Sequence, residues 1–182
     1  MADPIDYESL NEWIELYNND SYSINLSGWI IGDNSDNDTL QGGLYGGAGT
    51  ILRSGSYAVI TDDLTRVYDN FNVSSNALRI YVDDSSIGNG LINSGETIFL
   101  YDKNKTLIHS VYYNSTSEGL SWSFFNDIWL KTNSTPGYDN NGSLPVQQMN
   151  NKQNRKKSVF PHKSPQPACD YVRLWSIRGN PG

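Results

Sequence analysis

The sequence predicts an all-β sandwich followed by a polar tail. Segments that alternate apolar and polar residues recur along most of the chain, and turns rich in Asn, Gly, Ser and Asp separate them. Short strands with turns at this spacing are typical of sandwich folds. Aromatic residues make up 12% of the 182 residues, so the chain has the bulk to fill a core. No segment keeps a helical period over three turns, and residues 3–13 suit a single helical turn.

Seven or eight strands follow from this pattern. In chain order they are residues 13–17, 24–33, 57–63, 77–84, 96–101, 106–113, 120–125 and 127–131. The alternation is clearest over residues 96–113, where two strands flank the loop Asp102–Lys105 and predict a hairpin. Large apolar side chains within these strands are expected in the core, namely Trp13, Ile14, Leu16, Trp29, Ile98 and Leu100.

The opening segment "NEWIELYN" (residues 11–18) places Glu12 and Glu15 among apolar residues. The two aliphatic residues of the strand point to one side, so Glu15 points to the other. We expect Glu15 on the solvent side, or paired across strands with Arg53 or Arg79. A buried functional carboxylate is the alternative. The segment is therefore predicted to serve the fold rather than chemistry.

Charge divides the chain into two parts. Residues 1–148 hold 19 acidic residues against 6 basic ones, a net of −13, whereas residues 149–182 have a net of +6. The acidic body is a poor nucleic-acid binder, because affinity for phosphate comes chiefly from Lys and Arg. Composition changes near Ser143, which predicts a sandwich domain over residues 5–143 and a basic, Pro-containing tail over residues 144–182.

Several interpretations of this tail stay open. It is a disordered linker, a non-native extension, or the source of one added strand. The segment "DYVRLWSI" (residues 170–177) has high strand propensity and suits addition to an open sheet edge, its own or a neighbour's. That interpretation predicts self-association through the tail. The positive charge also suits an acidic partner, or the acidic body itself.

Four segments together resemble the lamin tail domain family, which has an immunoglobulin-like β-sandwich fold. They are "NEWIELYN" followed by "LSGWIIGD", then "ILRSGSYAVITDD", "SGETIFLYDKNKTLIHSVYY" and "STPGYDNN". The segments stand in the order that the family shows, and the resemblance covers about residues 5–141. No heptad rod precedes the domain, so the likeness is to the bacterial and archaeal type.

The resemblance implies a binding or scaffolding module without enzymatic activity or cofactor. Family members outside animals tend to be single domains of secreted or surface proteins, so a protein or a cell surface is the expected partner. One alternative is an accessory domain of a hydrolase or nuclease whose catalytic part lies outside this chain. Another is a structural subunit that assembles by strand addition. The expected contacts are exposed aromatic residues, namely Tyr45, Tyr68, Trp122 and Trp129.

The family's domain normally begins with a short strand before the opening segment, and "MADPIDYESL" does not supply that strand. Two expectations follow. Either Met1 is an internal methionine, with a signal peptide and the first strand upstream, or residues 2–9 substitute for the strand. In the first case the sandwich exposes an unpaired edge.

An extracellular or cell-surface location is expected from the asparagines. Eight Asn-x-Ser/Thr motifs occur, and they would carry glycans on surface turns of an exported protein. The expected glycosylation sites include Asn25, Asn37, Asn72, Asn104, Asn114 and Asn133. This chain contains no signal peptide. No run of about 18 apolar residues occurs, so no membrane span is expected.

Acidic turns suggest a calcium site. The turns at residues 33–39, 61–63 and 83–86 are acidic and are expected to gather at one end of the sandwich. Carboxylate and amide oxygens are the ligands that calcium takes, and residues 33–39 are rich in both. Asp33, Asp36 and Asp38 are the expected ligands. The turn lacks the Gly and the distant Glu of an EF-hand loop, so a solvated acidic loop is the alternative.

No catalytic constellation is visible in the sequence. The chain has two His and one Cys. His109 and Ser110 point to opposite faces of one strand and cannot act together, so we expect His109 in the core or in a cross-strand contact. The Gly-rich segment at residues 42–49 lacks the Lys-Ser/Thr of a phosphate loop and predicts a loop tip.

Overall fold

The computed structural model describes residues 3–4 and 8–140. The strands in this part of the chain are β1 (Ile14–Tyr17), β2 (Ile24–Asn25), β3 (Ile30–Gly32), β4 (Asn37–Gly42), β5 (Ile51–Leu52), β6 (Tyr57–Thr61), β7 (Leu78–Val82), β8 (Gly95–Tyr101), β9 (Leu107–Asn114), β10 (Leu120–Phe125) and β11 (Ile128–Asn133). The helices are α1 (Glu8–Asn11) and α2 (Val67–Asn70). The predicted boundary at Ser143 and every expectation for the tail lie outside the described residues.

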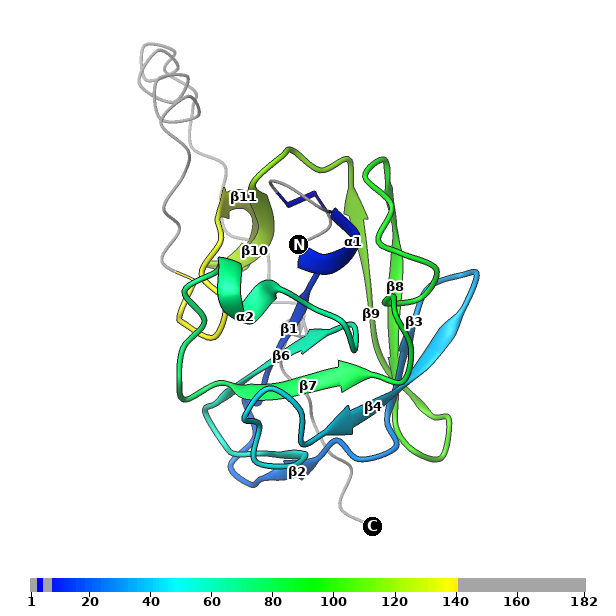
Figure 1. Ribbon diagram of the computed structural model, residues 1–182, viewed down its shortest axis with the longest axis vertical. Helices are drawn as coiled ribbons and strands as arrows, with labels where there is room; N and C mark the ends of the chain where they lie inside the picture. The colour runs from blue at the N-terminus through cyan, green and yellow to red at the C-terminus, as the bar shows by residue number, and fades with distance from the viewer. Residues whose placement is uncertain (1–2, 5–7, 141–182) are drawn as a thin grey trace, which may run out of the picture.

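Seven of the strands form one sheet in the order β1-β6-β7-β4-β3-β8-β9. Neighbours are antiparallel except β6 and β7, which are parallel and therefore need a crossover. The crossover contains α2. In Figure 1 the strands β8 and β9 stand upright while β6 and β7 run across the molecule, so the sheet curls strongly. The smaller pairs are β2 with β5 and β10 with β11.

The curled sheet packs its two halves around one core, which makes it a sandwich. Buried residues of β1, β6 and β7 and buried residues of β3 and β8 belong to the same cluster. Five of the residues expected in the core lie in this cluster, namely Ile14, Leu16, Trp29, Ile98 and Leu100. Trp13 is also buried, but it points to the opposite side of the sheet, since neighbours along a strand alternate in direction.

A second layer covers the outer side of β1, β6 and β7. Trp13 and Val59 of the sheet pack there against Val67 of α2 and Ala77. Residues 134–139 close the same side, because Ser74 donates its backbone N–H to Pro136 and the Tyr57 hydroxyl donates to Asp139 at 2.6 Å. This half of the sheet is therefore buried on both of its sides.

The seven or eight predicted strands become eleven. Residues 24–33 were expected as one strand, but the chain turns at Gly28, which has a φ of +73°, and splits the segment into β2 and β3. The acidic turn expected at 33–39 ends early, since β4 begins at Asn37. The single helical turn expected near the N-terminus is α1, whereas α2 lacked a sequence signal. No helix within residues 8–140 is long and apolar enough to cross a membrane.

Candidate binding surface

Glu15 is buried, contrary to the expectation of a solvent-facing side chain. Only 7% of the residue is exposed, and its carboxyl Oε2 accepts the backbone N–H of Gly137 at 2.6 Å. Burial raises the pKa of Glu15 to about 8, so the group is largely protonated at neutral pH. The predicted pairing with Arg79 is also wrong, because that guanidinium lies 4.6 Å from the Tyr68 ring centre and donates to the Tyr45 carbonyl.

The other polar residues of the opening segment are buried as well. The Glu12 carboxylate accepts the backbone N–H of Leu91 at 3.1 Å, and burial raises the pKa of Glu12 to about 7. The Asn18 amide donates to the Leu52 carbonyl at 3.0 Å. Asn11 accepts a hydrogen bond from the Asn70 side chain in α2. Each polar residue thus holds a different segment of the fold.

A cavity of about 70 Å³ lies between the edge strands of the sheet and the hairpin β10–β11. Its walls come from Trp13, Trp122, Trp129 and Tyr113, with Glu15 among them. A cavity of ~150 Å³ is needed to hold benzene, whereas ~10–15 Å³ is enough for one water. The size therefore suits a few water molecules, which would solvate the carboxyl group.

Two of the three expected calcium ligands, Asp36 and Asp38, lie together in the structure, but the third member of their group is Asp84 and not Asp33. Carboxylate oxygens of Asp36, Asp38 and Asp84 lie within 4.8 Å of one another. Asp33 is not in this group, because its carboxylate accepts the backbone N–H groups of Asp36 and Asn89. Burial, together with the neighbouring carboxylates, raises the pKa of Asp38 to about 7. Asp84 lies in the acidic turn at residues 83–86, which was expected to gather with residues 33–39, although Asp84 itself was not among the expected ligands. Calcium binding stays a prediction.

The aromatic residues expected as exposed contacts are packed instead. Tyr45 and Tyr68 lie against each other, with ring centres 5.4 Å apart. Trp122 donates its indole N–H to the Asn114 carbonyl, and the Lys131 ammonium lies 5.3 Å from its ring centre. Trp129 is half-buried in the hairpin. All four are therefore half-buried and none is a fully exposed contact; their role in binding stays a prediction.

His109 faces the interior opposite Leu100, as expected for a core or cross-strand residue. Burial lowers the pKa of His109. Its Nε2 atom is buried and has no hydrogen-bond partner in the described part of the chain. Ser110 points to the other side of β9, so the two cannot form a nucleophile and base pair.

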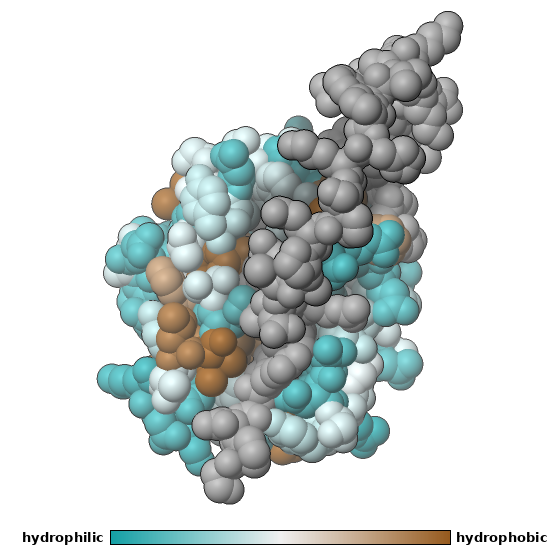
Figure 2. All heavy atoms as spheres, turned by 180° about the vertical axis from the view of Figure 1, so that it is seen from behind, coloured by the Kyte–Doolittle hydropathy of each residue, from teal (hydrophilic) through white to brown (hydrophobic). Residues whose placement is uncertain are grey.

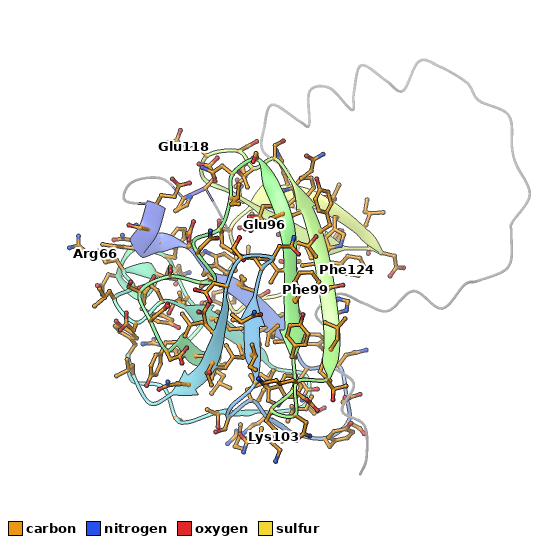
Figure 3. The ribbon with its side chains drawn as sticks, turned by 90° about the vertical axis from the view of Figure 1, so that its right-hand side faces the viewer. Arg66, Glu96, Phe99, Lys103, Glu118 and Phe124 are labelled. Carbon is orange, nitrogen blue, oxygen red and sulfur yellow. The ribbon has the colours of Figure 1, made fainter. Side chains whose placement is uncertain are left out.

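No helix or strand of the described residues covers the outer side of β3, β8 and β9, which carries aromatic side chains. Glu96, Ile98 and Leu100 of β8 point to the core, so the residues between them point outward. We define the aromatic face as six outward residues of the three strands, namely Ile30, Thr97, Phe99, Tyr101, Ser110 and Tyr112. Leu107 and Asn114 of β9 also point to this side. Figure 3 looks onto this side of the molecule, with Phe99 on β8. Tyr112 is 65% exposed.

Two features of the aromatic face bear on binding. The rings of Phe99 and Tyr101 lie 6.2 Å apart at an interplanar angle of 24°. A groove of about 190 Å³ opens beside Tyr101 and is lined by Ile30, Asn37 and Lys105. Seen from behind, apolar side chains also gather on the side of the molecule where β8 and β9 lie (Figure 2).

The sequence held a signal for this face that the prediction missed. An antiparallel strand with one solvated side normally alternates apolar and polar residues. The segment "TIFLY" in β8 is apolar or aromatic on both sides, with Ile98 and Leu100 facing inward and Phe99 and Tyr101 facing outward. A large apolar residue on an uncovered side is the informative exception.

The asparagines of the predicted glycosylation motifs are all exposed within the described residues. The seven in this part of the chain are Asn19, Asn25, Asn37, Asn72, Asn104, Asn114 and Asn133. Asn37 lies at the groove beside Tyr101. Glycosylation itself stays a prediction.

The curled sheet packed around one core defines the class of protein as a β-sandwich. Residues 1–115 match the family model described as Lamin Tail Domain, and the chain belongs to that family. The sandwich is therefore of the immunoglobulin-like type. No curated protein and no solved structure matches the chain.

The family match ends just after β9, whereas the resemblance extends to about residue 141. Hairpin β10–β11 and the Thr-Pro-Gly segment that follows it lie beyond the match. They are nonetheless tied to the matched part, because Gly137 donates its N–H to Glu15 and the Asn140 side chain donates to the Phe124 carbonyl. The described residues beyond position 115 thus include segments that are hydrogen-bonded to the matched part.

Proposed function

We propose that this chain is a non-enzymatic binding domain of a secreted or cell-surface protein, and that the aromatic face is its contact surface. The observation that supports this most strongly is the combination of aromatic rings and absent charge on an uncovered sheet face. The outward residues of β3, β8 and β9 include no charged side chain, although residues 1–148 have a net charge of −13. Depletion of charge and enrichment of aromatic residues are typical of the centre of binding interfaces.

The assignment as a non-enzyme has a physical basis. The buried carboxyl groups of Glu12 and Glu15 each accept a backbone N–H, which is a structural use. His109 points into the core, so it is not placed to move a proton at the surface. General acid–base catalysis needs such a group within reach of a bound substrate.

The assignment to the outside of the cell rests on the exposed asparagines. Seven glycosylation motifs in the described residues all place their asparagine at the surface, where a glycan can be attached without disturbing the core.

A labelling experiment tests the location. Cells that make the full chain are treated with an amine-reactive biotin reagent that cannot cross membranes. Lys103 and Lys105 lie exposed in the turn between β8 and β9, so the protein on intact cells, or in their medium, is expected to be labelled. Labelling only after lysis would contradict the proposal. A cytosolic protein of the same cells controls for leakage.

The role of the aromatic face has its own test. The double variant Phe99→Ala/Tyr112→Ala is expected to be exported like the unchanged chain but to be retained less by the cell surface. Tyr138→Ala removes an exposed aromatic residue, 43% exposed, that lies outside the aromatic face, so it serves as the control. Equal retention of the double variant and the control would show that the aromatic face is not the contact surface.

A further inference from the structure

We infer that the ligand of the aromatic face is a neutral, extended polysaccharide chain. The inference rests on the proposed function and adds the chemical class of the ligand. Three properties of the described residues lead to it, namely the absence of charge, the pairing of rings with free hydroxyl groups, and the small, open shape of the face.

The absence of charge argues for a neutral ligand. The aromatic face contains no carboxylate and no ammonium group. The nearest lysines are Lys103 and Lys105 at one end of it, in the turn after β8, and Lys105 lines the groove beside Tyr101. A strongly anionic ligand would be repelled by the acidic body, and a strongly cationic ligand would find its carboxylates elsewhere, at Asp36, Asp38 and Asp84. A neutral ligand is neither repelled by the acidic body nor drawn away to the carboxylates of Asp36, Asp38 and Asp84.

The side chains of the face combine flat rings with polar groups. The pyranose ring has apolar C–H faces and a rim of hydroxyl groups, so it needs both an aromatic surface and hydrogen-bond partners beside it. Phe99 and Tyr101 provide two rings in nearly parallel planes. Between and beside the rings lie hydroxyl groups that make no hydrogen bond within residues 8–140, those of Thr97, Tyr101, Ser110 and Tyr112.

Other tyrosines of the domain use their hydroxyl groups in hydrogen bonds within the protein. The hydroxyls of Tyr57, Tyr68 and Tyr113 all bond to protein acceptors, at 2.6 to 3.2 Å. Tyr101 and Tyr112 keep theirs for solvent or for a ligand. A hydroxyl that both donates and accepts suits a sugar hydroxyl, which does the same.

The shape of the face argues against a large partner. Stable protein interfaces take about 800 Å² and about 20–30 residues from each side. The aromatic face spans only three strands, and charged loops border it at Asp83 and Asp102. The face is also open rather than a deep pocket, with one groove at Ile30 and Tyr101. An extended chain that lies across the strands and enters the groove fits this shape.

Binding to solid and soluble polysaccharides tests the inference. The full chain is mixed with cellulose, chitin, β-mannan and neutral xylan, and the fraction removed from solution is measured. Retention on at least one of them is expected. Because the ligand is uncharged, the dissociation constant is expected to change less than twofold between ~0.05 and ~0.5 M NaCl. Polygalacturonate serves as the anionic comparison and is expected to bind less.

Variants locate the site. Tyr112→Ala and Phe99→Ala are each expected to raise the dissociation constant about tenfold, the size of effect seen when one stacked ring is removed. Tyr112 is the safer position, because its 65% exposure leaves folding unaffected. Tyr138→Ala is expected to bind like the unchanged chain.

The outcomes separate the ligand class from the proposed function. Failure to bind all four neutral polysaccharides, or binding that survives both Phe99→Ala and Tyr112→Ala, would overturn the inference. If the same two variants still lose retention at the cell surface, the aromatic face is a contact surface for a protein instead, and only the ligand class is wrong. If retention at the surface is also unchanged, the proposed function fails with it.

Discussion

The outward sides of the two halves of the seven-stranded sheet have different surroundings. On β1 and β6 the outward residues Glu15 and Val59 are buried, because α2 and residues 134–139 lie over them. On β8 and β9 the outward residues Phe99 and Tyr112 have no such layer within the described chain (Figure 1). Alternation along a strand thus says which side a residue points to, but not whether that side faces solvent.

The covered half explains the glutamates of the opening segment. An uncompensated buried carboxyl group is costly, and this fold compensates each one with a backbone N–H that would otherwise be unsatisfied. Glu12 holds the loop at Leu91, and Glu15 holds the turn at Gly137. The segment "NEWIELYN" therefore organises loops that are distant in sequence, which is a structural role.

The largest expected effect is at Glu15. Glu15→Ala leaves the Gly137 N–H without its acceptor and opens a cavity, so the free energy of unfolding is expected to fall by about 3 kcal/mol. Urea unfolding at pH 7 measures it. On the uncovered half, Thr97→Ala is expected to change the value by less than about 0.5 kcal/mol. Equal losses of unfolding free energy in Glu15→Ala and Thr97→Ala would contradict the difference in burial between the two halves of the sheet.

The next effect is at Gly137, on the other side of the same contact. Its φ is +77°, and an added Cβ would lie 2.6 Å from the Ala77 Cβ, so Gly137→Ala is expected to cost about 2 kcal/mol. Gly55→Ala is the matched control, because its φ is +66° but nothing lies within 4 Å of an added Cβ. Gly55→Ala is expected to lower the free energy of unfolding by about 1 kcal/mol, which is the cost of a positive φ for a residue that has a Cβ. Identical losses would show that close packing at Gly137 is unimportant.

Because Glu15 is buried in the covered half of the sheet, the free energy of unfolding is expected to depend on pH. The pKa of Glu15 is about 8 in the folded protein and 4.5 in a model peptide, so between these values the folded state binds more protons than the unfolded state. The free energy of unfolding therefore falls as pH rises from about 5 to about 8, by at most about 1.4 kcal/mol per pH unit for this group. Glu12 adds to the fall up to about pH 7.

Urea unfolding from pH 5 to 8.5 measures this slope. Glu15→Gln keeps the acceptor and removes the titration, so its slope is expected to be shallower than that of the unchanged chain. Glu118→Gln, at an exposed position, is expected to leave the slope unchanged. A slope that Glu15→Gln does not alter would assign the pH dependence to other groups.

The smallest effect on stability is expected at the uncovered half. Tyr112→Ser removes a side chain that is 65% exposed, so the free energy of unfolding is expected to change by less than about 0.5 kcal/mol, as measured by urea unfolding. A loss above about 1.5 kcal/mol would mean that another layer covers β9 and would end the distinction between the halves.

The strand pattern can be predicted from the sequence, because side chains alternate along a strand and turns are local. The alternation over residues 96–113 predicts the hairpin, and the apolar positions of β1 and β8 predict the core. Which outward sides are covered depends instead on the packing of distant segments. Glu15 is buried by residues more than a hundred positions away, and Asp84 joins Asp36 and Asp38 across the sheet. Such contacts depend on how distant segments pack, and no local pattern encodes that.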